Sequence, residues 1–230
     1  MFAHINSIMF NLIFKVMRDL SKIIVITFLL ICNITWSQTD TLKVSKQTFN
    51  LEEALKNPLD VKILNLSNQN IVFEPNFFSK FENLEYLSLK NDHLKFIPTD
   101  IGSLKKLKVL DLSGNDFEVL PIELKNLTNL EELYLNDEVN FNLEKSISVL
   151  KELRSLKSLH LSNDKLNQLP KSFKQINNLE NLYLDKNNFK FLPKEIQGLD
   201  HLQYLDFENN PIKIKETELQ ELNFGFKIKI

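Results

Sequence analysis

The sequence predicts an α/β solenoid, in which short parallel strands line a concave sheet and short helical turns cover the outer side. The pattern LxxLxLxxNxLxxLP recurs along the chain, and its seven copies begin at Val61, Leu84, Leu107, Leu130, Leu156, Leu179 and Leu202. The steps between copies are 23 residues, except for one step of 26 residues. A fixed period in this range indicates supersecondary units that stack on their neighbours.

The third copy shows how one unit is expected to fold. Leu110 and Leu112 alternate with polar residues, and this period of two places both leucines inward on a short strand. Asn115 follows at the turn, where its amide accepts and donates backbone hydrogen bonds, so stacked copies should form a ladder. Leu124 and Leu127 predict a short helical turn on the outer side. One unit cannot bury its apolar face alone, and stacking provides the core.

These copies resemble the repeats of the leucine-rich repeat family, in the variant with Pro after the last LxxL turn. The resemblance covers roughly residues 48–230. It implies a horseshoe arc with a parallel concave sheet and short outer helical turns. It also implies an interaction scaffold rather than an enzyme.

Residues 1–37 predict an export signal. Lys22 precedes an apolar run over residues 23–31, and Thr35 and Ser37 supply small side chains before a cleavage site. The run is too short to span a bilayer, so we expect no stable membrane span in the mature chain. Met17 would begin a signal peptide of ordinary length, and we take it as the expected start. The protein should then be periplasmic, displayed at the cell surface or secreted.

Two alternatives for this segment stay open. It would be an uncleaved anchor if processing failed, or a lipid would be attached at Cys32. Ile31 stands where lipid-attachment motifs carry a small residue, which disfavours the second alternative. Cys32 is the only cysteine, and cleavage after Ser37 removes it, so the mature chain is expected to contain neither a disulfide nor a thiolate. The formal net charge of −2 gives no electrostatic reason to expect a nucleic acid partner.

The two ends of the repeat array carry cap patterns. Residues 38–60 read as a linker and a cap helix over 51–56, opened by the capping-box pair Asn50 and Glu53. The repeats occupy residues 61–213. Residues 214–230 then predict a closing helix at 215–222 and an edge strand at 226–230, where Lys227 and Lys229 should face away from the core and guard the edge.

Two irregularities interrupt the pattern. The fourth copy is the long one, and Leu143, Ile147 and Leu150 have the spacing of an amphipathic helix, which we expect near Glu144–Leu153. The ladder position also varies, since it reads Gln69, Asp92, Asn115, Glu138, Asp164, Asn187 and Asn210. A carboxylate accepts but cannot donate, so the ladder should be interrupted at three positions.

The sequence offers no catalytic, cofactor or metal motif. A Gly-rich phosphate loop, HExxH, GxSxG and CxxC are all missing from the sequence, and the four histidines fall at unrelated repeat positions. Ser88 and His160 share one outward row of the sheet with acidic residues. They are three strands apart, roughly 14 Å, which is too far for a nucleophile and its base.

The outward face of the strands carries the candidate binding residues. All four tyrosines of the chain fall there, although the core is filled by Leu, Ile and Phe. Tyrosine combines a rigid apolar ring with a polar tip, as interface anchors do. The predicted partner-binding residues are Tyr86, Tyr134, His160, Tyr183, Tyr204, Asp137, Asp185, Asp206 and Glu208.

This face predicts a non-catalytic module that binds a protein or peptide, with a basic or hydroxyl-rich partner surface. The alternative is a glycan- or cell-wall-binding protein that uses the tyrosines as stacking platforms. His160 should gain a proton below about pH 6.5 and thereby weaken binding to a basic partner.

Overall fold

The computed structural model describes residues 47–48, 51–138, 140–213 and 225–230. The chain divides into two units, Met1–Val44 and Ser45–Ile230, and all described residues belong to the second. The predicted export signal, the capping residue Asn50 and the closing helix predicted at 215–222 lie outside the described residues. None of the helices in the described ranges has both the length and the apolar composition that a membrane span requires.

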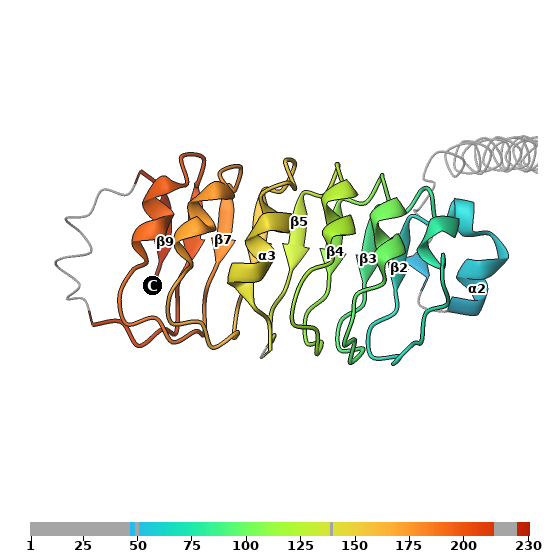
Figure 1. Cartoon of the computed structure of the whole chain (residues 1–230), viewed down its shortest axis with the longest axis horizontal. Helices are drawn as coiled ribbons and strands as arrows, with labels where there is room; N and C mark the ends of the chain where they lie inside the picture. Colours follow the sequence, from blue (N-terminus) through green and yellow to red (C-terminus); the bar gives the residue numbers. More distant parts are fainter. Residues whose placement is uncertain (1–46, 49–50, 139, 214–224) are drawn as a thin grey trace, which may run out of the picture. The chain divides into compact units, whose positions relative to one another are not determined.

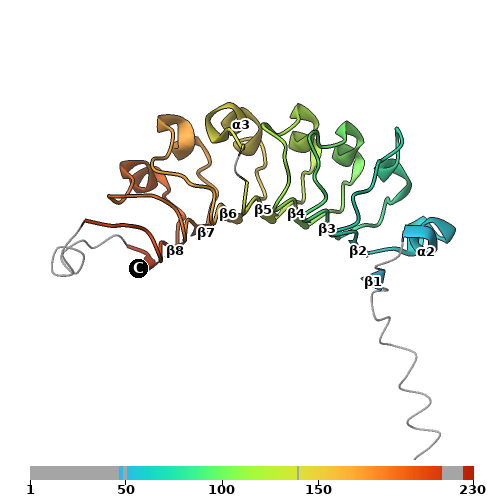
Figure 2. The ribbon, with the colours of Figure 1, turned by 90° about the horizontal axis from the view of Figure 1, so that it is seen from below.

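A parallel sheet forms the inner side of the second unit (Figures 1 and 2). Within the described ranges it has nine strands, whose order in space is their order in the chain. They are β1 (Gln47–Thr48), β2 (Ile63–Asn65), β3 (Tyr86–Ser88), β4 (Val109–Asp111), β5 (Glu132–Tyr134), β6 (Ser158–His160), β7 (Asn181–Tyr183), β8 (Tyr204–Asp206) and β9 (Lys227–Lys229). Strands β2 to β8 fall in the seven predicted copies, and the solenoid fold is therefore confirmed.

The register of the sheet is unbroken from strand to strand. Successive central leucines lie opposite one another, and each is 0% exposed: Leu64, Leu87, Leu110, Leu133, Leu159, Leu182 and Leu205. Because side chains alternate along a strand, this row fixes the neighbouring positions on the opposite face of the sheet. The core is thus one continuous column, and the outward rows are equally regular.

Helical turns cover the outer edge of the arc (Figure 2). They are α2 (Leu51–Lys56), η1 (Pro58–Asp60), η2 (Phe78–Lys80), η3 (Thr99–Ser103), η4 (Ile122–Asn126), α3 (Leu143–Leu150), η5 (Lys171–Gln175) and η6 (Lys194–Gly198). Four of the η turns follow a proline, and the few residues before the next strand suit a short 3-10 turn. These turns are bulkier than strands spaced about 4.8 Å apart, and the difference bends the stack into an arc.

The long fourth repeat carries the predicted helix. α3 runs over Leu143–Leu150, so it begins one residue before the predicted range and ends three residues short of its predicted end. Asn142 caps it, because its side-chain oxygen accepts a hydrogen bond from the Lys145 amide at 3.0 Å. Leu143, Ile147 and Leu150 are buried as predicted. The insertion therefore lengthens the outer side and leaves the register of β5 and β6 intact.

At the turns, the acids of the ladder keep the accepted hydrogen bonds and lose only the donated ones. Asp92, Glu138 and Asp164 each accept a backbone hydrogen bond from the preceding repeat, as the asparagines do. What is lost is the donating half: Asn115 and Asn187 give hydrogen bonds to backbone carbonyls, which a carboxylate cannot do. Each of the three acids consequently keeps one buried oxygen without a partner.

Strands protect both ends of the described sheet. α2 spans the predicted residues Leu51–Lys56, and β1, which the sequence pattern did not reveal, pairs with β2. At the other end β9 pairs with β8 in parallel. Lys227 and Lys229 are exposed and Ile228 is half-buried, as the alternation predicts.

Candidate functional site

Two outward rows make up the concave face. The first row reads Ile63, Tyr86, Val109, Glu132, Ser158, Asn181 and Tyr204. The second row reads Asn65, Ser88, Asp111, Tyr134, His160, Tyr183 and Asp206. All four tyrosines and His160 are half-buried, with part of each ring in contact with solvent. The register thus places six of the predicted site residues, these five and Asp206, where the alternation of the sequence predicts them.

The second row contains a stack of three rings. The centroids of Tyr134 and His160 are 3.9 Å apart, with an angle of 15° between the ring planes. Those of His160 and Tyr183 are 4.0 Å apart, with an angle of 5°. Tyr204 lies beside this stack, tilted, with its centroid 5.6 Å from that of Tyr183. In-register parallel strands bring like positions to about 4.8 Å, which is close to a stacking distance.

Glu132 holds two members of the stack by one oxygen. The Tyr134 hydroxyl donates to Glu132 Oε1 at 2.8 Å, and His160 Nε2 lies 2.9 Å from the same atom. A carboxylate only accepts, so His160 carries its proton on Nε2. The stack is therefore fixed both by ring contact and by hydrogen bonds to one residue of the first row.

The pH at which His160 was expected to gain a proton, about 6.5, is too high. Its side chain is 12% exposed, and burial lowers the pKa of the imidazole below its ordinary value of 6.5. The hydrogen bond to Glu132 opposes this effect, although burial remains the larger cause. The imidazole therefore gains its proton in more acidic solution than the sequence analysis predicts. The neighbouring rings that bury the imidazole belong to other strands, so its burial does not follow from its own repeat.

Three of the four acidic residues predicted around the stack have a lysine of the chain within 4.0 Å. Lys229 of β9 places its Nζ 2.7 Å from Glu208 and 3.6 Å from Asp206, which also accepts from the Tyr204 hydroxyl. Asp185 accepts from Ser162 Oγ and lies 3.7 Å from Lys186 Nζ. The exposed Asp137 accepts a hydrogen bond from the side-chain amide of Asn163 at 2.7 Å. The C-terminal half of the face is thus less acidic than its sequence indicates.

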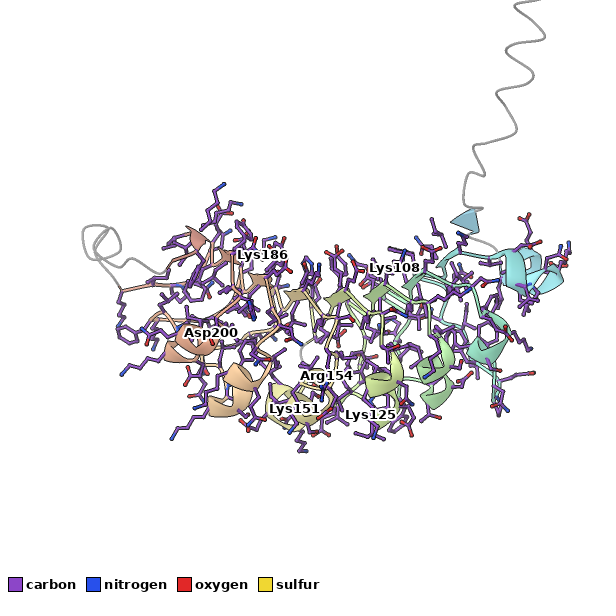
Figure 3. The ribbon with its side chains drawn as sticks, turned by 90° about the horizontal axis from the view of Figure 1, so that it is seen from above. Lys108, Lys125, Lys151, Arg154, Lys186 and Asp200 are labelled. Carbon is purple, nitrogen blue, oxygen red and sulfur yellow. The ribbon has the colours of Figure 1, made fainter. Side chains whose placement is uncertain are left out.

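A charged row runs immediately before the strands. It alternates in sign and reads Lys62, Glu85, Lys108, Glu131, Lys157 and Glu180. Glu85 lies 3.0 Å from Lys62 and 2.8 Å from Lys108, and Glu180 lies 3.6 Å from Lys157. Figure 3 places Lys108 and Lys186 on the strand side of the arc, whereas Lys125, Lys151 and Arg154 lie on the outer side. Most acids near the concave face therefore have a cation of their own chain.

Two carboxylates of the concave face differ from this pattern. Asp111 accepts from the Ser113 amide and Ser88 Oγ, and Glu132 accepts from Tyr134 and His160. In the described part of the chain, neither has a Lys or Arg nitrogen within 4.0 Å. Neither was among the site residues predicted from the sequence. The alternation of the charged row was a partial signal, because it places Glu85 and Glu180 beside lysines.

The serine and the histidine of the second row lie on strands that are not neighbours. Ser88 lies in β3 and is 2% exposed, with its Oγ 2.7 Å from Ser67 Oγ, whereas His160 lies in β6. The described residues contain no group of three His, Cys, Asp or Glu side chains that could hold a metal ion.

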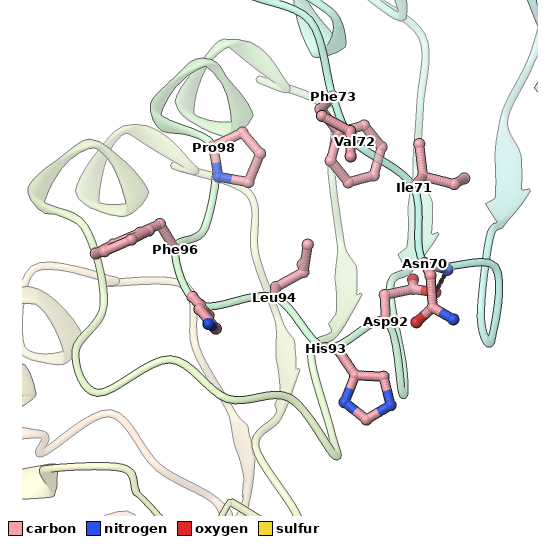
Figure 4. A pocket seen from close by; sticks show the side chains of 10 residues that line it. Asn70, Ile71, Val72, Phe73, Asp92, His93, Leu94, Phe96 and Pro98 are labelled. Atoms are coloured by element: carbon pink, nitrogen blue, oxygen red, sulfur yellow. Dashed lines mark hydrogen bonds between the residues drawn. The ribbon is translucent and has the colours of Figure 1, made fainter.

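Two hollows lie away from this face, on the loops that lead from strands to outer turns. The first has a volume of about 620 Å³ and separates the loop that bears Val72 and Phe73 from the loop that bears Leu94 and Phe96 (Figure 4). The second, of about 650 Å³, has Phe191 at the equivalent repeat position. Phe96 and Phe191 are 85% and 63% exposed. These rings fill no core, and nothing in the structure shows what covers them.

Comparisons with known proteins agree on one family. A family model described as a leucine-rich repeat region matches residues 42–182, and a second leucine-rich repeat model matches residues 154–212. No curated protein matches the chain significantly. Among solved structures, a leucine-rich repeat protein of Leptospira interrogans is 30% identical, with a TM-score of 0.60. The match covers 81% of this chain and 53% of that one, so the chain spans about half the length of that relative.

Two further structures are similar. The plant peptide hormone receptor RGFR1, in complex with RGF2, is 29% identical with a TM-score of 0.50, and the match covers 66% of this chain and 25% of the receptor. Internalin C2 of Listeria monocytogenes is 20% identical with a TM-score of 0.54, covers 80% and 78% of the two chains, and shows the fold alone. Since the first family model matches more than half of its residues, the chain belongs to the leucine-rich repeat family.

Proposed function

We propose that this protein is a non-catalytic binding module whose concave sheet receives a protein or peptide partner. The observation that carries the proposal is the stack of Tyr134, His160 and Tyr183. The rings are held by each other and by Glu132 before any partner arrives. Binding therefore costs little side-chain entropy, which is a general requirement for aromatic anchors in interfaces.

The family and one relative support a protein or peptide partner. The similar plant structure is a peptide hormone receptor bound to its ligand, RGF2. Leucine-rich repeats present a preformed concave sheet, and an extended segment lying along it would contact several strands at once. For this chain we propose only the chemical class of the partner, a protein or peptide.

A glycan is the weaker candidate for the same face. Sugar rings stack on the flat faces of aromatic side chains, but both faces of His160 are covered by its neighbours. Tyr134 and Tyr183 each have one face covered by His160 in the same way. Within the stack, only the Tyr134 face toward Asp111 lies beside no other ring, and such a surface suits the side chains and backbone of a polypeptide better than a pyranose.

We also propose that the protein is exported, on the basis of the n-region, apolar run and cleavage pattern in residues 1–37. An exported module would meet partners at the cell envelope, on neighbouring cells or in the medium.

Selection of a displayed peptide library on the purified protein yields ligands even though the natural partner is not identified.

The double variant Tyr134→Ala/Tyr183→Ala tests the concave-face assignment. Peptides selected on the parent protein should bind this variant at least about 30-fold more weakly, which corresponds to about 2 kcal/mol for the loss of anchor rings. The fold should persist, since both rings are half-buried outward residues and not part of the leucine core. Isothermal titration calorimetry gives the affinities, and circular dichroism checks the fold.

The matched control is Lys125→Ala/Lys151→Ala on the outer side of the arc (Figure 3). It changes two exposed side chains far from the sheet and should leave the affinity unchanged. Equal affinity of the parent and the double tyrosine variant would contradict the concave-face assignment and would direct attention to the outer surface of α3.

A further inference from the structure

We propose that the concave face contains a receptor for one cationic side chain of the partner, formed by Tyr86, Asp111, Glu132 and Tyr134. The inference rests on the proposed binding function and gives the chemistry of the partner at one point. The partner presents a lysine or an arginine there, within an extended segment that continues over the stack of Tyr134, His160 and Tyr183.

The sheet register brings the four residues together around β4. In the first row Tyr86 and Glu132 flank Val109, and in the second row Ser88 and Tyr134 flank Asp111. The two tyrosines stand at diagonal corners on strands that are two spacings apart, roughly 10 Å. Val109 and Asp111 have shorter side chains than the tyrosines. In the register of the sheet they lie between the strands that carry the two rings.

Within the described part of the chain, no lysine or arginine matches the charges of this site. Glu85, Glu180, Asp185, Asp206 and Glu208 each have a lysine nitrogen within 4.0 Å. In the described ranges, the only basic side chain this close to Asp111 or Glu132 is His160.

His160 does not neutralise the site. Burial lowers its pKa, so the ring is uncharged at neutral pH. The two carboxylates at the centre of the face are therefore available to a cation from a partner, whereas Asp185, Asp206 and Glu208 already have a lysine nearby.

The surrounding groups respond to both carboxylates. Burial raises the pKa of the Tyr86 hydroxyl, and the charges of Asp111 and Glu132 raise it further. The same two carboxylates raise the pKa of Tyr134, after burial and its hydrogen bond to Glu132. The two acids therefore act at one place, and both tyrosines stay neutral there.

One face of Tyr134 is open to such a cation. His160 covers the face toward β6 at 3.9 Å, whereas the neighbour toward β4 is Asp111, which has no ring. Tyr86 has only Ile63 and Val109 as neighbours in its row. A cation over Asp111 would gain the carboxylate on one side and the face of a tyrosine on the other, and cation–π attraction is strongest where water is partly excluded.

A free metal ion suits this site less well than a side chain. Calcium takes 6–8 oxygen ligands, and magnesium demands near-octahedral geometry. Two carboxylates on neighbouring strands do not supply such a set, and the described residues contain no metal-binding group. An ammonium or guanidinium group needs only one or two carboxylates and accepts an aromatic wall.

The four tyrosines of the chain serve as reporters in a nuclear magnetic resonance titration that needs no natural partner. The full exported chain, labelled at the tyrosine rings, is titrated at pH 7 with N-acetyl-arginine amide, N-acetyl-lysine amide and the neutral N-acetyl-citrulline amide. We expect both cations to shift the ring signals of Tyr86 and Tyr134 saturably, with millimolar affinity. Tyr204 should not shift, and citrulline should have no effect.

The variant Asp111→Asn/Glu132→Gln removes both charges with little change of shape and should abolish the saturable shifts. Glu123→Gln/Glu152→Gln is the matched control, because it removes the same net charge from residues of the outer turns and should leave the shifts unchanged. Thermal unfolding checks that the first variant folds. If it does not, the comparison between arginine and citrulline amides on the parent protein still decides the question.

Three results would overturn the inference: equal shifts with citrulline, shifts centred on Tyr183 and Tyr204, or full binding by the variant. Any of them would leave the proposed function standing, provided that selected peptides still lose affinity in Tyr134→Ala/Tyr183→Ala. Conversely, arginine amide binding at Tyr86 and Tyr134 without any peptide selected on the concave face would retain the cation receptor and contradict the protein-binding role.

Discussion

Side chains of this protein separate by a single criterion, namely on which side of the strand they emerge. Leu182 is 0% exposed and lies in the row of central leucines, whereas Tyr183 beside it belongs to the ring stack. Inward positions therefore determine stability, and outward positions determine what the face can bind. A one-residue error in register would exchange the two roles.

Leu182→Asp should destabilise the protein strongly, and Lys186→Asp should change stability by less than about 0.5 kcal/mol. An unpaired carboxylate in the leucine column costs several kcal/mol. Lys186 is exposed, and its backbone has a φ of 56°, a conformation that Asp adopts readily. Urea denaturation of the two variants measures the difference. Equal midpoints would show that the register is wrong.

Much of the site at this scale could be predicted from the sequence, because outward rows follow from alternation and a fixed repeat. The ring column was predictable for the same reason. The pairing of Asp206 and Glu208 with Lys229 was not, since Lys229 reaches them only through the position of β9 in space. The unpaired state of Asp111 and Glu132 was not predictable either, because it is a property of everything around them.

At the scale of elements, the turn ladder combines regular geometry with imperfect chemistry. Burial raises the pKa of Glu138 to about 8 and that of Asp164 to about 8, and it also raises the pKa of Asp92. Each has one oxygen without a partner. With a pKa of about 8, Glu138 and Asp164 are mostly protonated at pH 7, and a protonated carboxyl has a donor, as an asparagine amide does. The sequence predicted the missing donors, but not the raised pKa of the three acids, which follows from their burial.

The ladder makes stability depend on pH in an unusual direction. The folded chain holds protons on Glu138 and Asp164 up to about pH 8, whereas their ordinary pKa values are 4.5 and 3.8. The folded state thus binds more protons than the unfolded state, and the free energy of unfolding must fall as pH rises. We expect it to be at least about 2 kcal/mol lower at pH 8 than at pH 5, measured by urea denaturation.

Glu138→Gln should raise the unfolding midpoint at pH 8 and flatten this dependence. The backbone N–H of Asn115 donates to Glu138 Oε1 at 2.8 Å. A glutamine side chain keeps an oxygen that can accept this bond and adds an N–H donor. Glu152→Gln on the exposed outer side is the control, and its pH dependence should follow the parent. Stability that increases from pH 5 to pH 8 in the parent would contradict the protonated state of these acids.

The elements themselves were predictable to different degrees. The strands and α3 follow from periodicity. Periodic spacing does not locate the C-terminus of a helix, so the predicted end of α3 lies three residues beyond its observed end at Leu150. β1 has only two residues and therefore no pattern to detect. It becomes a strand because β2 offers an unpaired edge, which is a tertiary cause.

At the scale of the whole molecule, the first prediction concerns processing. The exported protein should begin at Gln38, because Thr35 and Ser37 supply the small residues before the cleavage site. Intact mass spectrometry and N-terminal sequencing of material recovered outside the cytoplasm decide this. A chain that retains Cys32 with an attached lipid would refute it.

The chain order of the strands in the sheet has a consequence for how motion spreads through the protein. Each described strand bonds only to its neighbours in sequence, so opening one end breaks few contacts elsewhere. Amide hydrogen exchange should therefore show a gradient, slowest at β4 to β6 and faster toward β2 and β8. The rings of Tyr134 and His160 would then lie on the part of the sheet that opens least often, so a partner would bind a surface that is already ordered.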